Sequence, residues 1–463
     1  MLNKSHEVVV VSPNSKWNWI PSNIWVGVGN MTPDQVTFPL APVYKRKGIT
    51  FHQALATELH PEGSTEVPSP HVSLRYTDPT MVNQLAELTY DYLINATGPK
   101  LNFAATPGLG PDGNTVSVCT PQHAVQASEH LAAVIAKMKK GERQHLVVGV
   151  GHGTCTCEGA AFEYAFNVEH ELRAAGVRDL ADLTYLTNEF ELGDFGVGGM
   201  TFHQQGEETT SKYWTEALFR ERGVQAVVQA HVEKVEPGVI FYEQLDGSKN
   251  TLSFDFAMLL PPFRGVDMKA FDVKGEDISA DVFAPNGFMK VDADYGAKPY
   301  EEWRAADWPH TYQSVGYANV FGVGIAFAPP HPISQPRKSP NGTVITPSPP
   351  RTGMPSGVMG KTAAMTICDR IKKGPSAAAH RASMADMGAA CVASAGTGIR
   401  QGTAASMTMY PVVPDFERFP GSGRSDKDTF GEIGLAGHWT KYLLHVLFIY
   451  KAKARPGWQY IPE

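Results

Sequence analysis

The chain has 463 residues, which is long enough for two or three domains. Its hydrophobic fraction of 42% and charged fraction of 19% allow a large core and exclude global disorder. A net charge of −7 without a long charged run argues against binding to nucleic acid, and five cysteines are too few for a disulfide-stapled secreted scaffold. No apolar run is long enough to cross a bilayer, and the first residues lack the apolar segment of a secretory signal.

Short apolar runs and amphipathic segments alternate along the chain. They predict strands at 8–11, 49–51, 92–95, 144–150, 183–186 and 319–325, and helices over 121–138, 158–174 and 356–372. The run at 8–11 reads as a buried strand. The proline-rich stretch 329–350 is typical of a long irregular loop. Strand, glycine turn, helix and strand in succession indicate a doubly wound α/β fold.

A glycine-rich turn between a predicted strand and a predicted helix carries two cysteines. Glycines at 149, 151 and 153 allow a tight turn, although their spacing departs from the dinucleotide fingerprint. Cys157 directly precedes the predicted helix, where free backbone amides and the helix dipole stabilise a thiolate. The alternative for Cys157, and more so for Cys155, is simple packing behind the turn.

Two further segments attract attention. A strand that ends in Asn95 runs into Ala-Thr-Gly-Pro-Lys, a sequence typical of a crossing between nucleotide-binding domains. Cys391 lies in a stretch of small residues far from Cys157 along the chain, which does not prevent contact in a fold whose chain returns to its first domain.

These motifs resemble those of the sulfide:quinone oxidoreductases and of the related flavoprotein of flavocytochrome c sulfide dehydrogenase. The resemblance covers essentially the whole chain, and type II NADH dehydrogenases share the fold without the cysteine pattern. It rests on residues 20–29, 96–101, 118–120, Cys157 with 162–165, 350–353, and 391–396. It implies two Rossmann-like domains plus a C-terminal region, divided as 1–105 and 313–400 for the FAD-binding domain, 106–312 for the second domain and 401–463 for the C-terminal region.

The resemblance also implies FAD and a redox-active cysteine pair that oxidises sulfide and reduces a membrane quinone. Cys157 and Cys391 match the pair, Cys119 matches an accessory cysteine, and Cys155 is a further candidate. The positions that match flavin contacts are Ser12, Asn23, Ala56, Thr97, Gly98, Gly324 and Gly353. No metal site is expected. The protein is expected to form a homo-oligomer.

The chain departs from the family in three places. The glycine fingerprint for the FAD pyrophosphate precedes the strand at 8–11 in the family, so the first strand–helix unit is expected to be missing here. We favour a start site placed too late, and the alternative is a chain with impaired FAD binding. Cys391 aligns only with a few inserted residues, and a register at Ser383 competes with it. The usual pair of C-terminal amphipathic helices is reduced to one segment, 438–454.

That segment holds an apolar run, 443–450, flanked by Lys441, Lys451, Lys453 and Arg455. It suits a helix that lies in the membrane interface with basic anchors, and equally a helix docked on the protein core. The first alternative predicts a peripheral protein of a prokaryotic inner membrane, on a face that the sequence does not specify.

Three competing functions remain open. A flavocytochrome-type subunit would need haem from a partner, because the chain has no Cys-x-x-Cys-His. An NADH:quinone dehydrogenase would bind its nucleotide at the turn 149–153, which His152 and Cys155 crowd. A flavin-free binding protein is the non-enzymatic alternative.

Overall fold

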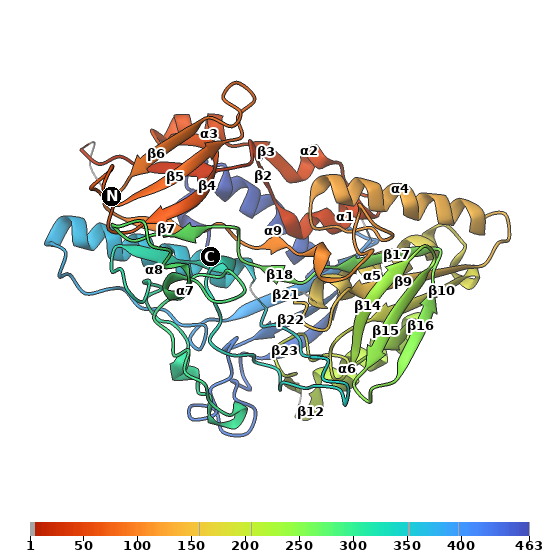
Figure 1. Cartoon of the computed structure of the whole chain (residues 1–463). Helices are drawn as coiled ribbons and strands as arrows, with labels where there is room; N and C mark the ends of the chain where they lie inside the picture. Colours follow the sequence, from red (N-terminus) through yellow and green to blue (C-terminus); the bar gives the residue numbers. More distant parts are fainter. Residues whose placement is uncertain (1–4, 157, 205, 351, 397, 463) are drawn as a thin grey trace.

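The computed structural model describes residues 5–156, 158–204, 206–350, 352–396 and 398–462. The first unit of the chain is a mixed sheet in the order β1 (Val9–Ser12), β4 (Thr50–His60), β5 (His71–Tyr76) and β6 (Leu85–Thr89) (Figure 1). β1 runs parallel to β4, and the others pair antiparallel. The prediction of a buried strand at 8–11 is wrong: β1 is only half-buried and Val8 is 46% exposed, because β1 is an edge strand in the described part of the chain.

Later parts of the chain return to this first unit. β7 (Leu93–Asn95) pairs in parallel with β20 (Val320–Gly322), and β19 (Lys269–Ala270) pairs in parallel with β4. β8 (Lys100–Leu101) pairs with β18 (Phe263–Arg264). The predicted strand at 319–325 is therefore shorter than expected, since a 3₁₀ turn follows it at Gly324–Ala326.

A four-stranded parallel sheet forms the second unit, in the order β13 (Gln225–Val227), β10 (Ala181–Leu186), β9 (Gln144–Val150) and β17 (Phe256–Leu260). All five residues of β17 and six of the seven in β9 are buried, as in a sheet covered on both faces. α4 (Pro121–Met138) and α5 (Glu158–Ala174) have the predicted bounds. Pro121 at the first position of α4 and the Thr120 hydroxyl, which accepts from the His123 N–H, explain where that helix begins.

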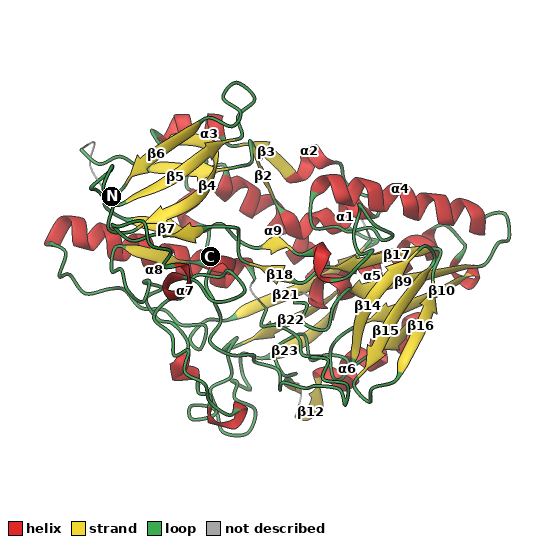
Figure 2. Ribbon diagram, viewed as in Figure 1, coloured by secondary structure: helices red, strands yellow, loops and turns green. Residues whose placement is uncertain are grey.

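The C-terminal region adds a three-stranded antiparallel sheet, β21 (Ala389–Ala395), β22 (Thr403–Met409) and β23 (Phe430–Gly434), followed by α9 (Leu435–Ala452). α9 packs on β21 and β22, and β21 packs on α5 (Figure 2). The expected domain boundary at 400 lies in the connection between β21 and β22, two neighbouring strands of one sheet.

The other elements are smaller or lie at the margins of these sheets, apart from α8, which follows the proline-rich loop. They are β2 (Lys16–Asn18), α1 (Asn23–Gly27), α2 (Pro33–Val36), β3 (Thr37–Pro39), α3 (Ala41–Lys47), β11 (Thr201–Gln204), β12 (Glu207–Thr210), α6 (Ser211–Arg222), β14 (Ala230–Glu236), β15 (Val239–Gln244), β16 (Lys249–Ser253), α7 (Ser279–Val282) and α8 (Gly353–Lys373). α8 begins three residues earlier than the sequence predicts.

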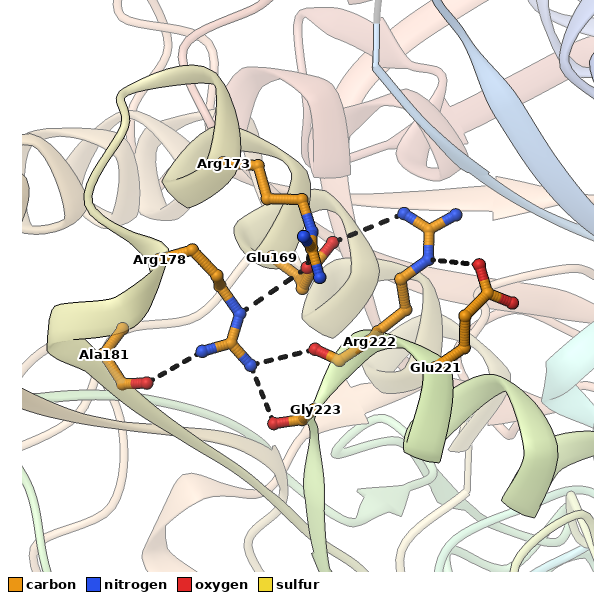
Figure 3. A network of polar contacts seen from close by, with 7 residues as sticks. All are labelled: Glu169, Arg173, Arg178, Ala181, Glu221, Arg222 and Gly223. Atoms are coloured by element: carbon orange, nitrogen blue, oxygen red, sulfur yellow. Dashed lines mark hydrogen bonds and ion pairs between the residues drawn. The ribbon is translucent and has the colours of Figure 1, made fainter.

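The C-terminal half of α5 is held by a buried carboxylate that three arginines share (Figure 3). Glu169 is fully buried and forms ion pairs with Arg173, Arg178 (3.5 Å) and Arg222 (3.5 Å). Arg178 also donates to the carbonyl oxygens of Ala181 and Gly223, at 2.8 and 2.7 Å. This cluster therefore joins α5 to the start of β10 and to the end of α6.

Replacing Glu169 with Ala should lower the free energy of unfolding by about 3–5 kcal/mol, because it leaves the partly buried guanidinium groups without their counter-ion. Arg173→Ala is the matched control: its side chain is 52% exposed, and its loss should cost at most about 1 kcal/mol. Urea denaturation followed by tryptophan fluorescence measures both. Equal unfolding midpoints for the two variants would contradict this role of Glu169.

Candidate functional site

The turn after β9 places the start of α5 where the sequence predicts it. Gly149 is required there, because a Cβ on it would lie 1.9 Å from the carbonyl oxygen of Leu186 on the neighbouring strand. Cys157 itself lies outside the described residues, and Glu158 is the first residue of α5. The backbone amides of the first turn of α5 are the groups that favour negative charge at this point.

Cys391 on β21 lies against that first turn. A Cβ built on Gly159 would be 3.1 Å from the Sγ of Cys391, so the thiol is next to a residue two positions after Cys157. Cys391 is half-buried and in thiol form, and burial raises the pKa of its thiol to about 11. The negative charge of Glu163 adds to this rise, and the ammonium group of Lys441 opposes it. Ser383, the competing position, uses its hydroxyl to accept from the Ala385 N–H.

A buried ion pair stands beside Cys391. Lys441 Nζ on α9 lies 2.9 Å from Glu163 Oε2 on α5, and the two side chains are 10% and 6% exposed. The N–H of Ser394 on β21 donates to the other Glu163 oxygen at 3.1 Å. Burial raises the pKa of Glu163, while Lys441 opposes that shift. The expectation that Lys441 is a basic membrane anchor is wrong, because this ion pair keeps it inside the protein.

Two histidines extend the polar face of α9 on either side of Lys441. His438 Nδ1 lies 2.5 Å from the Ser394 hydroxyl, and His445 Nδ1 lies 2.9 Å from the Ser22 hydroxyl. Both histidines are buried, and burial lowers the pKa of each imidazole. Polar side chains therefore line the buried face of α9.

The opposite face of α9 is apolar and exposed. Trp439, Tyr442, Leu443 and Val446 are 49%, 55%, 54% and 46% exposed, and they lie on one side of the helix at spacings of three and four residues. This distribution is the reverse of that on a helix docked through an apolar stripe. The structure combines features of an interfacial helix and of a docked helix: α9 docks on the protein and still presents an apolar surface. Among the described residues, no helix is long and apolar enough to cross a membrane.

Four of the predicted flavin-contact residues come together from separate segments. Because β7 and β20 are parallel, Thr97 and Gly98 after β7 follow the same sheet edge as Gly324 after β20. Gly98 and Gly324 have left-handed φ angles of 70° and 64°, and Gly98 and Gly353 face open space. The buried hydroxyl of Thr352, just before α8, has no hydrogen-bond partner. Glycines and free amides at the carboxyl ends of parallel strands fit a dinucleotide cofactor.

The other three predicted flavin-contact residues are placed differently. Asn23 is fully buried, and its side-chain amide is engaged with that of Asn18, with reciprocal distances of 2.9 and 3.0 Å. Ser12 is the last residue of β1, and Ala56 lies in the middle of β4. The group around Gly98 and Gly353 therefore gives the better fit to a cofactor.

The two remaining candidate cysteines differ in burial: Cys155 is buried and Cys119 is half-buried. Cys155 is fully buried, and its thiol donates to the Leu260 carbonyl at 3.2 Å. The Cys119 N–H donates to the Ser117 hydroxyl, and burial raises the pKa of the Cys119 thiol to about 11. The placement of Cys155 favours a packing role. No cluster of metal-ligating side chains occurs within the described ranges.

Part of the proline-rich loop covers the glycine turn. The N–H groups of Thr346 and Ser348 donate to the carbonyls of Gly153 and Cys155, each at 2.8 Å. The Gly153 N–H donates to His231 Nδ1 at 3.0 Å. The Thr154 N–H donates to His152 Nδ1 at 3.2 Å. Two backbone donors of the kind that bind a nucleotide phosphate in a Rossmann turn are therefore used by histidines of the protein itself.

Comparisons with known proteins identify a relative in both sequence and fold. No protein-family model matches the chain. The sulfide-quinone reductase of Aquifex aeolicus (strain VF5) is 27% identical over 447 residues, which are 96% of this chain and 85% of the relative. The X-ray structure of the sulfide:quinone oxidoreductase from that bacterium matches with a TM-score of 0.74 at 25% identity, covering 97% of this chain and 86% of the other.

A more distant structure shares the fold alone. The NAD-dependent persulfide reductase of A. fulgidus has a TM-score of 0.50 at 14% identity, over 95% of this chain and 71% of its own. The predicted α/β fold with Rossmann-type domains is confirmed by the match to the Aquifex enzyme. Over almost its whole length, the chain is thus similar in both sequence and fold to the sulfide:quinone oxidoreductases.

Proposed function

We propose that the protein is an FAD-dependent enzyme that oxidises sulfide and passes the electrons to a quinone. The observation that carries the proposal is the position of Cys391, whose thiol lies on the first turn of α5 beside Gly159, two residues after Cys157. This position supports the pairing of Cys391 with Cys157 in a chain that is similar to a sulfide-quinone reductase.

In the proposed reaction, hydrosulfide attacks one sulfur of a Cys157–Cys391 disulfide. A new S–S bond forms, the disulfide breaks, and one cysteine becomes a persulfide while the other leaves as a thiolate. A second sulfide or thiolate can displace the bound sulfur as polysulfide. The amide dipoles of α5 stabilise the negative charge that arrives on sulfur at this step.

Thr97, Gly98, Gly324 and Gly353 would hold FAD at the carboxyl ends of β7 and β20. When bound there, FAD would accept the two electrons released when the two cysteine thiols re-form their disulfide, and the reduced flavin could in turn reduce a quinone. The protein contributes the glycine backbone that allows close approach, the orphan hydroxyl of Thr352, and the amides at the start of α8. Cys119 remains a proposed accessory thiol.

The geometry weighs against the competing functions. Nicotinamide nucleotide would have to displace the segment 343–350 and His231 from the turn 149–156, at the cost of their hydrogen bonds. A water-soluble haem partner would not explain the exposed apolar face of α9, whereas a lipid-soluble quinone does. The exposed face of α9 thus supports peripheral attachment to a membrane. A prokaryotic inner membrane and a homo-oligomer remain predictions from the resemblance.

Cys157→Ser and Cys391→Ser should each reduce sulfide-dependent quinone reduction by at least a hundredfold, because serine cannot form the disulfide. Bound flavin, followed by its visible absorption, should remain. The assay is anaerobic reduction of a soluble quinone with sulfide, and NADH serves as a donor that should give no reduction. Full activity of Cys391→Ser would contradict the pairing and revive Ser383 or a Cys155–Cys157 pair.

The reactivity of Cys391 should follow the charges beside it. In reduced protein, alkylation of Cys391 should rise with pH toward about 11. Glu163→Gln removes a negative charge and should make it faster at a given pH, while Lys441→Met should make it slower. Peptide mass spectrometry measures the rates, and Cys368 is the internal reference. Changes in the same direction in both variants would indicate general loosening instead.

The apolar face of α9 should attach the protein to lipid vesicles. Replacing both Leu443 and Val446 with Glu should weaken sedimentation with vesicles about a hundredfold or more, since each buried aliphatic side chain contributes about 1.5–3 kcal/mol. Leu85→Glu, at a side chain 77% exposed on β6, is the matched control and should bind as the unchanged protein does. Unchanged sedimentation of the double variant would exclude α9 as the attachment surface.

A further inference from the structure

The buried face of α9 carries three basic side chains at helical spacing. His438, Lys441 and His445 are 3%, 8% and 8% exposed, so the docked helix encloses all three. Residues three and four positions apart lie on the same side of a helix. Lys441 has its counter-ion in Glu163, whereas neither histidine has an acid partner among the described residues. The charges of this face are therefore balanced only while both imidazoles are neutral.

His438 fills a tight site at the connection between β21 and β22. A Cβ built on Gly402 would lie 2.2 Å from the ring Cδ2, so the imidazole touches the backbone just before β22. Its Nε2 lies 3.0 Å from the Gly398 carbonyl, which can only accept, and its Nδ1 lies 2.5 Å from the Ser394 hydroxyl. The neutral ring therefore donates from Nε2 and accepts at Nδ1. A second proton on Nδ1 would displace the hydrogen that Ser394 donates.

His445 lies one turn beyond Lys441, against the segment that leads into α1. Its Nδ1 is 2.9 Å from the hydroxyl of Ser22, the last residue of a 3₁₀ turn. The Trp25 indole on α1 lies edge-on to both imidazoles, with ring centroids 6.4 Å from that of His438 and 6.1 Å from that of His445. Neither an indole nor a hydroxyl supplies the negative charge that a protonated imidazole would need in a buried place.

The titratable groups around the two histidines do not supply it either. His170 on α5 acts on His438, and the Lys441 ammonium acts on His445, so both neighbours are basic. Glu163 is already paired with Lys441, and β22 has no titratable side chain. The other titratable side chains on neighbouring elements and on α9 itself are the half-buried Cys391, Tyr450 and Lys451 and the exposed Arg400, Glu432, Tyr442 and Tyr460.

Burial lowers the pKa of both imidazoles. The bond to the Gly398 carbonyl opposes this shift at His438 and His170 adds to it, while Lys441 adds to the shift at His445. On a released helix, both side chains would regain the ordinary pKa of about 6.5. Below about pH 6.5 the released helix thus binds more protons than the docked one, so docking weakens as the pH falls. Above that pH both forms are neutral, and docking does not depend on these groups.

We propose that the docking of α9 is a pH-sensitive switch: the helix stays docked while His438 and His445 are neutral, and it leaves α1, α5 and β21 when these two side chains take up protons. Three positive charges on its inner face would then meet the single carboxylate of Glu163. Release would separate the exposed apolar face of α9 from the thiol of Cys391. Because the switch depends on the packing of α9 alone, it does not require the proposed function.

Hydrogen exchange measured by mass spectrometry tests the switch in the unchanged protein. A released helix of 18 residues is marginal in water, so its amides should exchange. With rates corrected for the intrinsic effect of pH, protection of α9 should fall at least about tenfold from about pH 7.5 to about pH 5.5, because each histidine contributes up to about tenfold per pH unit. β17, whose five residues are buried and not titratable, is the reference and should stay protected. Constant protection of α9, an equal loss in β17, or a loss that does not reverse at the higher pH would overturn the proposal.

A double variant removes the two titrating groups and keeps polar side chains in their place. His438→Gln with His445→Gln should give α9 a protection that stays constant over the same pH range, whatever its level. His130→Gln with His145→Gln is the matched control: both histidines are exposed, on α4 and β9, and their loss should leave the pH response of α9 as it is. The full pH response in the first double variant, or its loss in the control, would overturn the proposal. If the first variant does not fold, the profile of the unchanged protein still decides. No sulfide, quinone or flavin is used, so failure of the sulfide assay is distinguishable from failure of the switch.

Discussion

The buried ion pair between Glu163 and Lys441 is the interaction on which the candidate site depends. It joins α5 to α9, and the Ser394 N–H ties β21 to the same carboxylate. Two charges removed from water are tolerated only with close partners and additional hydrogen bonds. A one-residue shift of α9 would leave both charges unpaired inside the protein. This requirement fixes the register of α9 and β21, and with it the place of Cys391 on the first turn of α5.

This constraint also explains why α9 has its polar side inward. The two histidines at 438 and 445 lie on the same face as Lys441 and find hydroxyl partners on β21 and near α1. With these polar groups on the buried side, Trp439, Tyr442, Leu443 and Val446 lie on the exposed side. Phe448 is an exception and stacks on Trp19. Polar docking and an exposed apolar stripe are therefore two results of one arrangement.

The elements that could be predicted from the sequence are those whose bounds depend on neighbouring residues. The bounds of α4 and α5 follow from periodicity, capping and the glycine turn, and the helix start after Cys157 follows with them. The buried state of β1 could not be predicted, because the burial of a strand depends on what lies at both its edges. The ion pair between Glu163 and Lys441 could not be predicted, because its two residues are 278 positions apart. A lysine beside an apolar run on a helix is also the pattern of an interfacial anchor. The order of residues along the chain could not choose between Cys391 and Ser383, and the packing of β21 on α5 favours Cys391.

The cover over the glycine turn has a consequence for how the protein is made. Residues 343–350 hydrogen bond to the turn at 153–156, and β21 lies on the first turn of α5, so the turn is closed by segments synthesised about 190 to 240 residues later. On the ribosome, the second unit of the chain has all its strands before either segment emerges. During that interval, the carbonyl groups of Gly153 and Cys155 lack the N–H donors of Thr346 and Ser348 that later cover the turn. The turn therefore reaches its closed form only after the proline-rich loop and β21 have been synthesised.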